Sequence, residues 1–213
     1  MDAITAYESS SGMSHAEIIA ARDAVLAQKS LTVAVFDDKF VPEMGVSPFI
    51  RRDDGIFIYT SHLAGHVQAL LEQKKASFII SADEASTKNI WARHRLKFSA
   101  AVTEVLRDES DFYDLCEVFA DAHGNTMSLI KGFTDFHMLR IIPEDGVLVL
   151  GFAKAFCVEG TKFDIVAHLS RAWLVAYGHL SKSVSGIVEL SALPVCYART
   201  FGYKSKQLQG LVK

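Results

Sequence analysis

The sequence lacks the motifs that mark the most familiar enzyme classes. It has no glycine-rich Rossmann or Walker loop, no Gly-x-Ser-x-Gly nucleophile motif and no Cys-x-x-Cys pair. These absences argue against the common nucleotide-binding proteins, against α/β-hydrolases and against dithiol oxidoreductases.

Strong basic charge, long apolar runs and cysteine are also scarce. The 213-residue chain has a formal net charge of −3, which argues against a nucleic-acid-binding surface. Its apolar runs have the length of strands, so we expect no membrane insertion. The three cysteines are scattered without metal-site spacing, and no secretory leader opens the chain, so we expect a cytoplasmic protein.

Hydrophobic residues, by contrast, make up half of the chain and can form a sizeable core. Strand patterns cover 31–36, 43–51, 55–61, 76–82, 95–107, 133–143 and 147–158, and helical patterns cover 15–28, 62–73, 85–94 and 110–123. A further short helix is expected to end near Lys131, and Glu144–Gly146 is expected to form a turn. Many strands are joined by short turns, so we predict an α+β fold built on an antiparallel barrel of about six strands with peripheral helices.

Domain boundaries follow from where these patterns begin and stop. Residues 1–13 are small and polar and are expected to form a flexible tail. Residues 14–170 form the predicted barrel domain, and the fold of 171–213 is not determined by its weak periodicity.

Two histidines in the segment 59–95 lie four residues apart. His62 and His66 would share one face of the predicted helix 62–73. Such a pair can bind a metal, although no Glu completes a zinc motif, or it can form an ordinary hydrogen-bonded pair. In a third interpretation Ser61 and His62 offer donors to an anion at the helix N-terminus.

Three basic clusters stand at the ends of predicted elements. They are Arg51-Arg52, Lys74-Lys75 and Arg93-His94-Arg95. Each alone is typical of a solvated turn. If the barrel brings them together, they form a pocket for phosphate or propionate groups.

Three other candidate site residues stand alone in the sequence and form no motif. Asp135 either caps a turn or orients a ligand histidine through a hydrogen bond. His168 and His179 lie towards the C-terminal end, where a histidine is either inert or an axial haem ligand.

The order of several short motifs resembles one family. The strand before SHLAGH, then KKASFII, WARHRLKF, VTEVLRD, TDFHMLRIIP and GFAKAF are similar to haem-utilisation proteins of the HugZ/HutZ type. These belong to the split-barrel superfamily that includes FMN-binding, pyridoxamine-phosphate-oxidase-like proteins. The likeness covers roughly residues 14–170. It implies a homodimeric split barrel that binds haem between its subunits.

The resemblance also implies roles for particular residues. Arg95 matches an arginine near the haem, His66 matches the second histidine of the Ser-His-x-x-x-His motif, and Asp135 matches an aspartate bonded to the iron ligand. Trp173 stands where shorter members have that ligand, so His168 and His179 become the candidates.

The implied function is that of a haem oxygenase. Such a protein opens the porphyrin with dioxygen and electrons from an external donor and releases iron for iron acquisition. A first alternative is an FMN-dependent oxidoreductase whose flavin phosphate contacts Arg51, Arg52, Ser61 and Lys74. The others are a non-catalytic haem carrier or storage protein and a split barrel without a cofactor.

Overall fold

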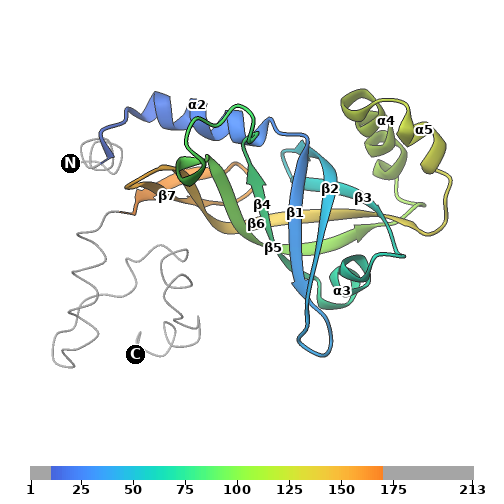
Figure 1. Ribbon diagram of the computed structural model, residues 1–213. Coiled ribbons are helices and arrows are strands. Elements are labelled where there is room, and N and C mark those ends of the chain that lie inside the picture. The colour runs from blue at the N-terminus through green and yellow to red at the C-terminus, as the bar shows by residue number, and fades with distance from the viewer. Residues whose placement is uncertain (1–10, 170–213) are drawn as a thin grey trace, which may run out of the picture.

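The fold was obtained as a computed structural model, which describes residues 11–169 (Figure 1). Most of the expected N-terminal tail and the whole segment 171–213, with His179, lie outside the described residues. Within the described range, no helix combines the length and the apolar character that crossing a membrane requires.

The centre of the molecule is a closed antiparallel β-barrel (Figure 1). The sheet runs in the order β3-β2-β1-β4-β5-β6-β7-β8, and the additional pairing of β3 with β6 closes the first six strands into a barrel. Strands β7 and β8 extend the sheet beyond β6. The prediction of an α+β fold on a barrel of about six strands is confirmed. The strands are β1 (Ser30–Phe36), β2 (Pro42–Arg52), β3 (Gly55–Ser61), β4 (Lys75–Ser81), β5 (Arg95–Val105), β6 (Phe136–Gly151), β7 (Lys154–Glu159) and β8 (Asp164–His168).

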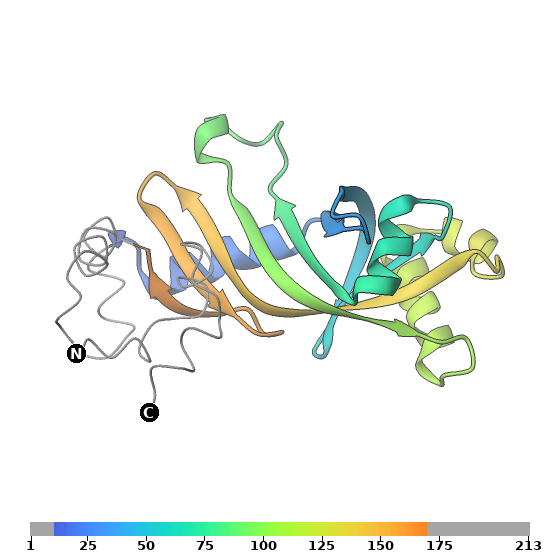
Figure 2. The ribbon, with the colours of Figure 1, turned by 90° about the horizontal axis from the view of Figure 1, so that it is seen from below.

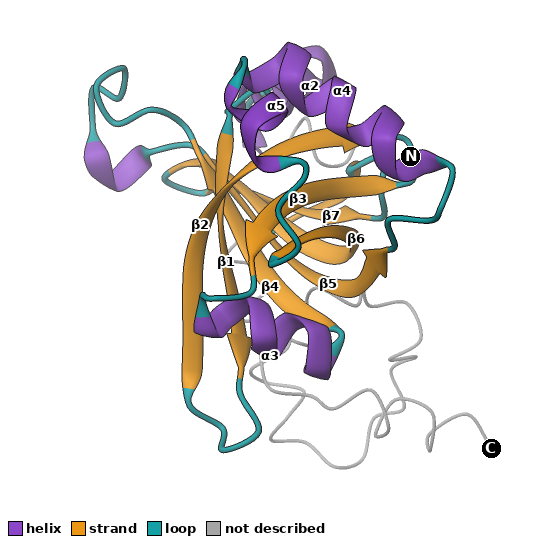
Figure 3. Ribbon diagram, turned by 90° about the vertical axis from the view of Figure 1, so that its right-hand side faces the viewer, coloured by secondary structure: helices purple, strands orange, loops and turns teal. Residues whose placement is uncertain are grey.

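Two helices cover opposite ends of the barrel, as Figure 3 shows. Helix α2 (His15–Leu26) begins with the capping box of Ser14 and Glu17, whose side chain and backbone groups bond reciprocally. Helix α3 (Gly65–Gln73) lies at the other end and packs on β1 and β2. Val67, Ala69 and Leu70 of α3 are buried in the same core as the barrel interior.

A second core lies outside the barrel. Helices α4 (Asp111–His123) and α5 (Thr126–Ile130) cover the outer face of β3 and the start of β6. Phe57 and Tyr59 of β3 are buried in one cluster with Phe112 and Phe119 of α4. Both faces of β3 are therefore buried, which explains its continuous apolar sequence.

The segment Glu144–Gly146 is not the predicted turn. Strand β6 runs through it, and the pairing register with β5 shifts between Ser99 and Ala100. Asp145 is buried and accepts a hydrogen bond of 3.0 Å from the Ser99 hydroxyl. At Gly146 an added Cβ would lie 2.2 Å from the Lys97 carbonyl oxygen. The glycine thus permits close approach of two strands at a β-bulge, and the chain reverses only after Gly151.

Three other boundaries differ from the sequence prediction. Residues 85–94 contain only the short 3₁₀ turn η1 (Ile90–Ala92), held by Asn89, whose side chain accepts from the Trp91 N–H. Helix α3 begins at Gly65, three residues later than expected. Strand β8 was not predicted, because it is only five residues long and lacks clear alternation.

Candidate functional site

One group of polar residues gathers where β3 ends and β6 begins. We call it the Asp135 cluster; its members are Ser61, His62, Glu104, Asp135 and His137. The Ser61 hydroxyl donates to an Asp135 carboxylate oxygen at 2.7 Å, and the His62 N–H donates to the Asp135 carbonyl at 2.6 Å. The His137 ring lies 5.4 Å from that of His62 and its Nδ1 lies 2.6 Å from Glu104. The structure therefore brings together two predicted site residues, Ser61 and Asp135.

Arg107 holds this cluster in place, and sequence reasoning missed it. Its guanidinium donates to the carbonyls of Lys131 at 2.8 Å and Phe136 at 3.1 Å, and also to the Phe133 carbonyl. It also lies 4.9 Å from the centre of the Phe112 ring. One side chain thus fixes the loop that carries Asp135. No local motif around Arg107 could have revealed this, because its partners lie far along the chain.

Tyr59 belongs to the same hydrogen-bond network around Arg107. Its hydroxyl receives a hydrogen bond from Arg107 and lies within 3.3 Å of the carbonyls of Ile130 and Lys131. Burial raises the pKa of the Tyr59 phenol, against the opposing effect of the Arg107 hydrogen bond. The phenol therefore stays protonated and serves as a donor within the loop.

Arg93 and Arg95 lie at the start of β5. The Arg93 side chain bonds to residues of the loop that precedes β5. Its Nε donates to the Ala82 carbonyl at 2.7 Å, and its Nη1 lies 3.4 Å from Glu84. Arg95 donates only Nη1, to the Arg93 carbonyl at 2.9 Å. Its Nε and Nη2 make no hydrogen bond to another described residue, and its side chain is partly exposed. Arg95 therefore retains donors for an anionic ligand.

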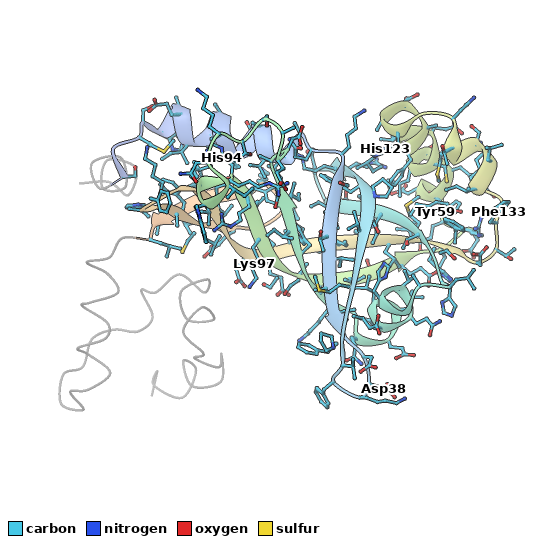
Figure 4. The ribbon with its side chains drawn as sticks, in the orientation of Figure 1. Asp38, Tyr59, His94, Lys97, His123 and Phe133 are labelled. Atoms are coloured by element: carbon cyan, nitrogen blue, oxygen red, sulfur yellow. The ribbon has the colours of Figure 1, made fainter. Side chains whose placement is uncertain are left out.

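Arg95 and Asp135 lie far apart within one chain. Arg95 pairs with Val149, whereas Asp135 precedes Phe136 at the other end of β6. At about 3.3 Å per residue, this stretch of β6 is on the order of 40 Å long. Figure 2 shows the long curved strands, and Figure 4 places His94 beside α2 and Tyr59 beside α4. Arg95 and Asp135 therefore belong to opposite ends of one long strand.

The three basic clusters do not form one pocket. Strand β4 pairs Lys75 with Ala101 at one end and Ser81 with Arg95 at the other, so Lys74 and Arg95 are separated by the strand length. Arg52 of β2 pairs with Gly55 at the start of β3, whereas Ser61 is the last residue of β3, so these two residues are also separated by the length of a strand. Lys74 is the exposed C-cap of α3 in a left-handed conformation with φ of 53°. The contacts expected for a flavin phosphate, Arg51, Arg52, Ser61 and Lys74, are therefore not together.

His66 is a buried residue of α3, and His62 precedes the helix. The two histidines thus do not share a helix face, contrary to the prediction. The His66 ring packs on Gly45 of β2, where an added Cβ would lie 2.2 Å from its Nε2. Nε2 has no hydrogen-bond partner among the described atoms. Burial lowers the pKa of His66, with a smaller opposing effect of Glu43.

This burial predicts a pH dependence of stability. Because the folded-state pKa of His66 lies below its ordinary value, the unfolded chain binds the proton more tightly. The contribution of His66 to folding is thus complete above about pH 6.5 and falls as the pH drops through that value towards the folded pKa. We expect the urea midpoint to fall less between about pH 8 and pH 5.5 in His66→Gln than in the wild type. His94→Gln is the control; equal falls in all three proteins would contradict the prediction.

His168 lies at the end of β8 and is buried. Its Nε2 lies 2.8 Å from the Ala153 carbonyl, and its ring lies 5.1 Å from that of Phe156. Iron ligation through Nε2 would require this hydrogen bond to break. In the part of the chain that the structure describes, no three histidine, cysteine or acidic side chains form a group that could hold a metal ion.

No family model matches the sequence. The curated protein called heme oxygenase HutZ, from Vibrio cholerae serotype O1, is 30% identical over 142 residues, which are 67% of this chain and 81% of that protein. The chain belongs to the HutZ family. The resemblance proposed from the short motifs is thereby confirmed.

Solved structures of other proteins share this fold. The crystal structure of HutZ from Vibrio cholerae, described there as a heme storage protein, superimposes with a TM-score of 0.56 at 27% identity, over 61% of this chain and 91% of that one. ChuZ from Campylobacter jejuni gives a TM-score of 0.64 at 20% identity, over 71% of this chain and 61% of ChuZ. A heme-binding protein from Mycobacterium smegmatis gives 0.57 at 17% identity, over 65% and 56% of the two chains. The last two likenesses concern the fold alone.

Proposed function

We propose that this protein binds haem and degrades it with dioxygen and electrons from an external donor. The observation that carries the proposal is the 30% identity to a curated heme oxygenase across 81% of that protein. Bound haem supplies the oxidative chemistry, in which dioxygen opens the porphyrin ring and iron leaves. The polypeptide has to bind the haem, orient it and place proton donors beside it.

Arg95 is the residue proposed to contact the haem directly. It carries a permanent positive charge and donor nitrogens without a described partner. A guanidinium pairs well with a carboxylate or with an oxygen atom that gains negative charge during the reaction. Arg93, whose donors are bound to its own loop, supports the position of Arg95.

The site is proposed to form between two copies of the chain. Asp135 and Arg95 are both assigned to the haem, yet they lie at opposite ends of β6. A dimer in which the second copy is reversed would place Asp135 of one subunit near Arg95 of the other. The outer face of the β1–β2 hairpin supports self-association, because Phe36, Met44 and Val46 are exposed there.

Asp135 is proposed to orient the histidine that ligates iron. One of its carboxylate oxygens is held by Ser61, and Arg107 fixes its loop, so the other oxygen can accept an imidazole N–H. His179 and His168 remain the predicted ligands; His179 lies outside the described residues. His66, buried in α3, and Lys74, the exposed C-cap of that helix, are the remaining predicted cofactor contacts.

Titration of the purified protein with haemin tests the proposal. We expect a saturable Soret band with micromolar or tighter affinity, followed by loss of that band and release of iron when a reductant is added in air. A stable band after reduction would instead indicate a haem carrier or storage protein. A purified protein with a flavin spectrum and no haem affinity would contradict the proposal. His168→Ala should change the Soret position if His168 ligates iron.

A further inference from the structure

A cationic hollow lies apart from the residues assigned to haem. It is formed by three segments that are distant in sequence: helix α2, the β2–β3 turn and the β7–β8 turn. Its volume is about 400 Å³. We call it the Arg51 pocket, and it is lined by Arg22, Asp23, Arg51, Arg52, Asp53, Thr161 and Lys162.

The lining carries four cationic side chains and two carboxylates, although the whole chain has a formal charge of −3. Arg22 neutralises one of the carboxylates, since its Nη2 lies 2.8 Å from Asp23 and its Nε donates to the same oxygen at 2.9 Å. Its remaining Nη1 donates to the Phe163 carbonyl at 3.0 Å. Arg22 is therefore anchored, and Asp23 is no longer a strong repulsive charge for an incoming anion.

The other three cations are not engaged in this way. Arg51, Arg52 and Lys162 make no ion pair with a described residue, and all three are exposed. The Arg51 guanidinium lies 5.8 Å from the centre of the buried Phe163 ring, which limits its freedom without occupying its donors. Asp53 is then the one carboxylate of the lining without a partner in the described chain. Three cations thus converge on a hollow with a single opposing charge.

We propose that the Arg51 pocket binds the phosphate group of a small phosphorylated molecule. Planar guanidinium groups offer paired N–H donors that match phosphate oxygens, and Lys162 and the Thr161 hydroxyl add a point charge and a further donor. The volume accommodates a phosphomonoester or diphosphate rather than a macromolecule. The proposal is independent of haem binding, because none of the haem-assigned residues lines this pocket.

Inorganic pyrophosphate is a suitable probe, measured by isothermal titration and by the thermal midpoint of the full chain. We expect saturable binding that raises the midpoint relative to sodium chloride of equal ionic strength. Arg52→Gln and Arg51→Gln should each weaken binding about tenfold, since each removes charge-assisted hydrogen bonds. Lys39→Gln, an exposed charge in the β1–β2 loop, should bind like the wild type.

Each outcome of this experiment decides the proposal. Arg51→Gln also removes the contact with the Phe163 ring, so its midpoint without ligand must be compared with the wild type. Arg52 has no described contact with this ring, so Arg52→Gln tests phosphate binding without that complication. Absence of binding at millimolar pyrophosphate, or equal affinity in Arg52→Gln, Lys39→Gln and the wild type, would overturn the proposal.

Discussion

We expect Gly146→Ala to destabilise the protein by about 3 kcal/mol or more, a large share of the stability of a typical domain. The added Cβ would lie 2.2 Å from the Lys97 carbonyl oxygen and 2.3 Å from the Phe98 ring. Neither neighbour can move freely, because Gly146 pairs with Phe98 in the β5–β6 ladder and Phe98 is buried in the barrel core. Relief of the clash therefore requires separation of two barrel strands.

Urea unfolding followed by circular dichroism measures this effect. Gly132→Ala is a matched control, because no heavy atom lies within 4 Å of its added Cβ. We expect Gly132→Ala to change the unfolding midpoint little. If the two variants had the same midpoint, the packing of β5 against β6 at this bulge would not be as tight as described.

The second large effect concerns haem breakdown, and it rests on the proposed function. Arg95→Ala should slow the loss of the Soret band about 100-fold, since it removes the charged donor that is proposed to contact the haem. The urea midpoint should change little, because Arg95 is partly exposed and its described hydrogen bond is to the neighbouring Arg93 carbonyl. An unfolded Arg95→Ala protein would show instead that Arg95 is structural.

A mixture of two inactive variants tests whether the site spans two chains. Arg95→Ala and Asp135→Asn, co-expressed, should regain roughly a quarter of wild-type activity, because half of the dimers are mixed and each mixed dimer has one intact site. The asparagine retains an acceptor for the Ser61 hydroxyl. Arg95→Ala paired with an Arg95→Ala/Asp135→Asn double variant is the control and should stay inactive. No recovery in the first mixture would contradict a site shared between two chains.

The barrel could be predicted from the sequence because its strands alternate clearly and its turns are short. The Ser14–Glu17 capping box and the Asp53–Gly55 hairpin region are local features and were confirmed. Glu144–Gly146 was misjudged, since a turn and a bulge use similar residues and only the partner strand distinguishes them. Strand β8 has only five residues, which are too few for a recognisable strand pattern in the sequence.

The candidate site was less accessible to sequence reasoning. The pattern identified Ser61 and Asp135, and the structure brings them together. The His62–His66 pair was misjudged, because it depended on where α3 begins. Arg107 and the Arg51 pocket depend on contacts between segments distant along the chain, which no local pattern reports.

Closure of the barrel by β3 and β6 has a consequence for how the chain acquires its fold. Ile56 pairs with Ile141, so the edge of β3 stays unpaired until the ribosome has released most of the barrel domain. Until then the nascent chain holds an open sheet with apolar residues on both faces of β3. Folding is therefore expected to be slow and late, with aggregation during synthesis as its main hazard.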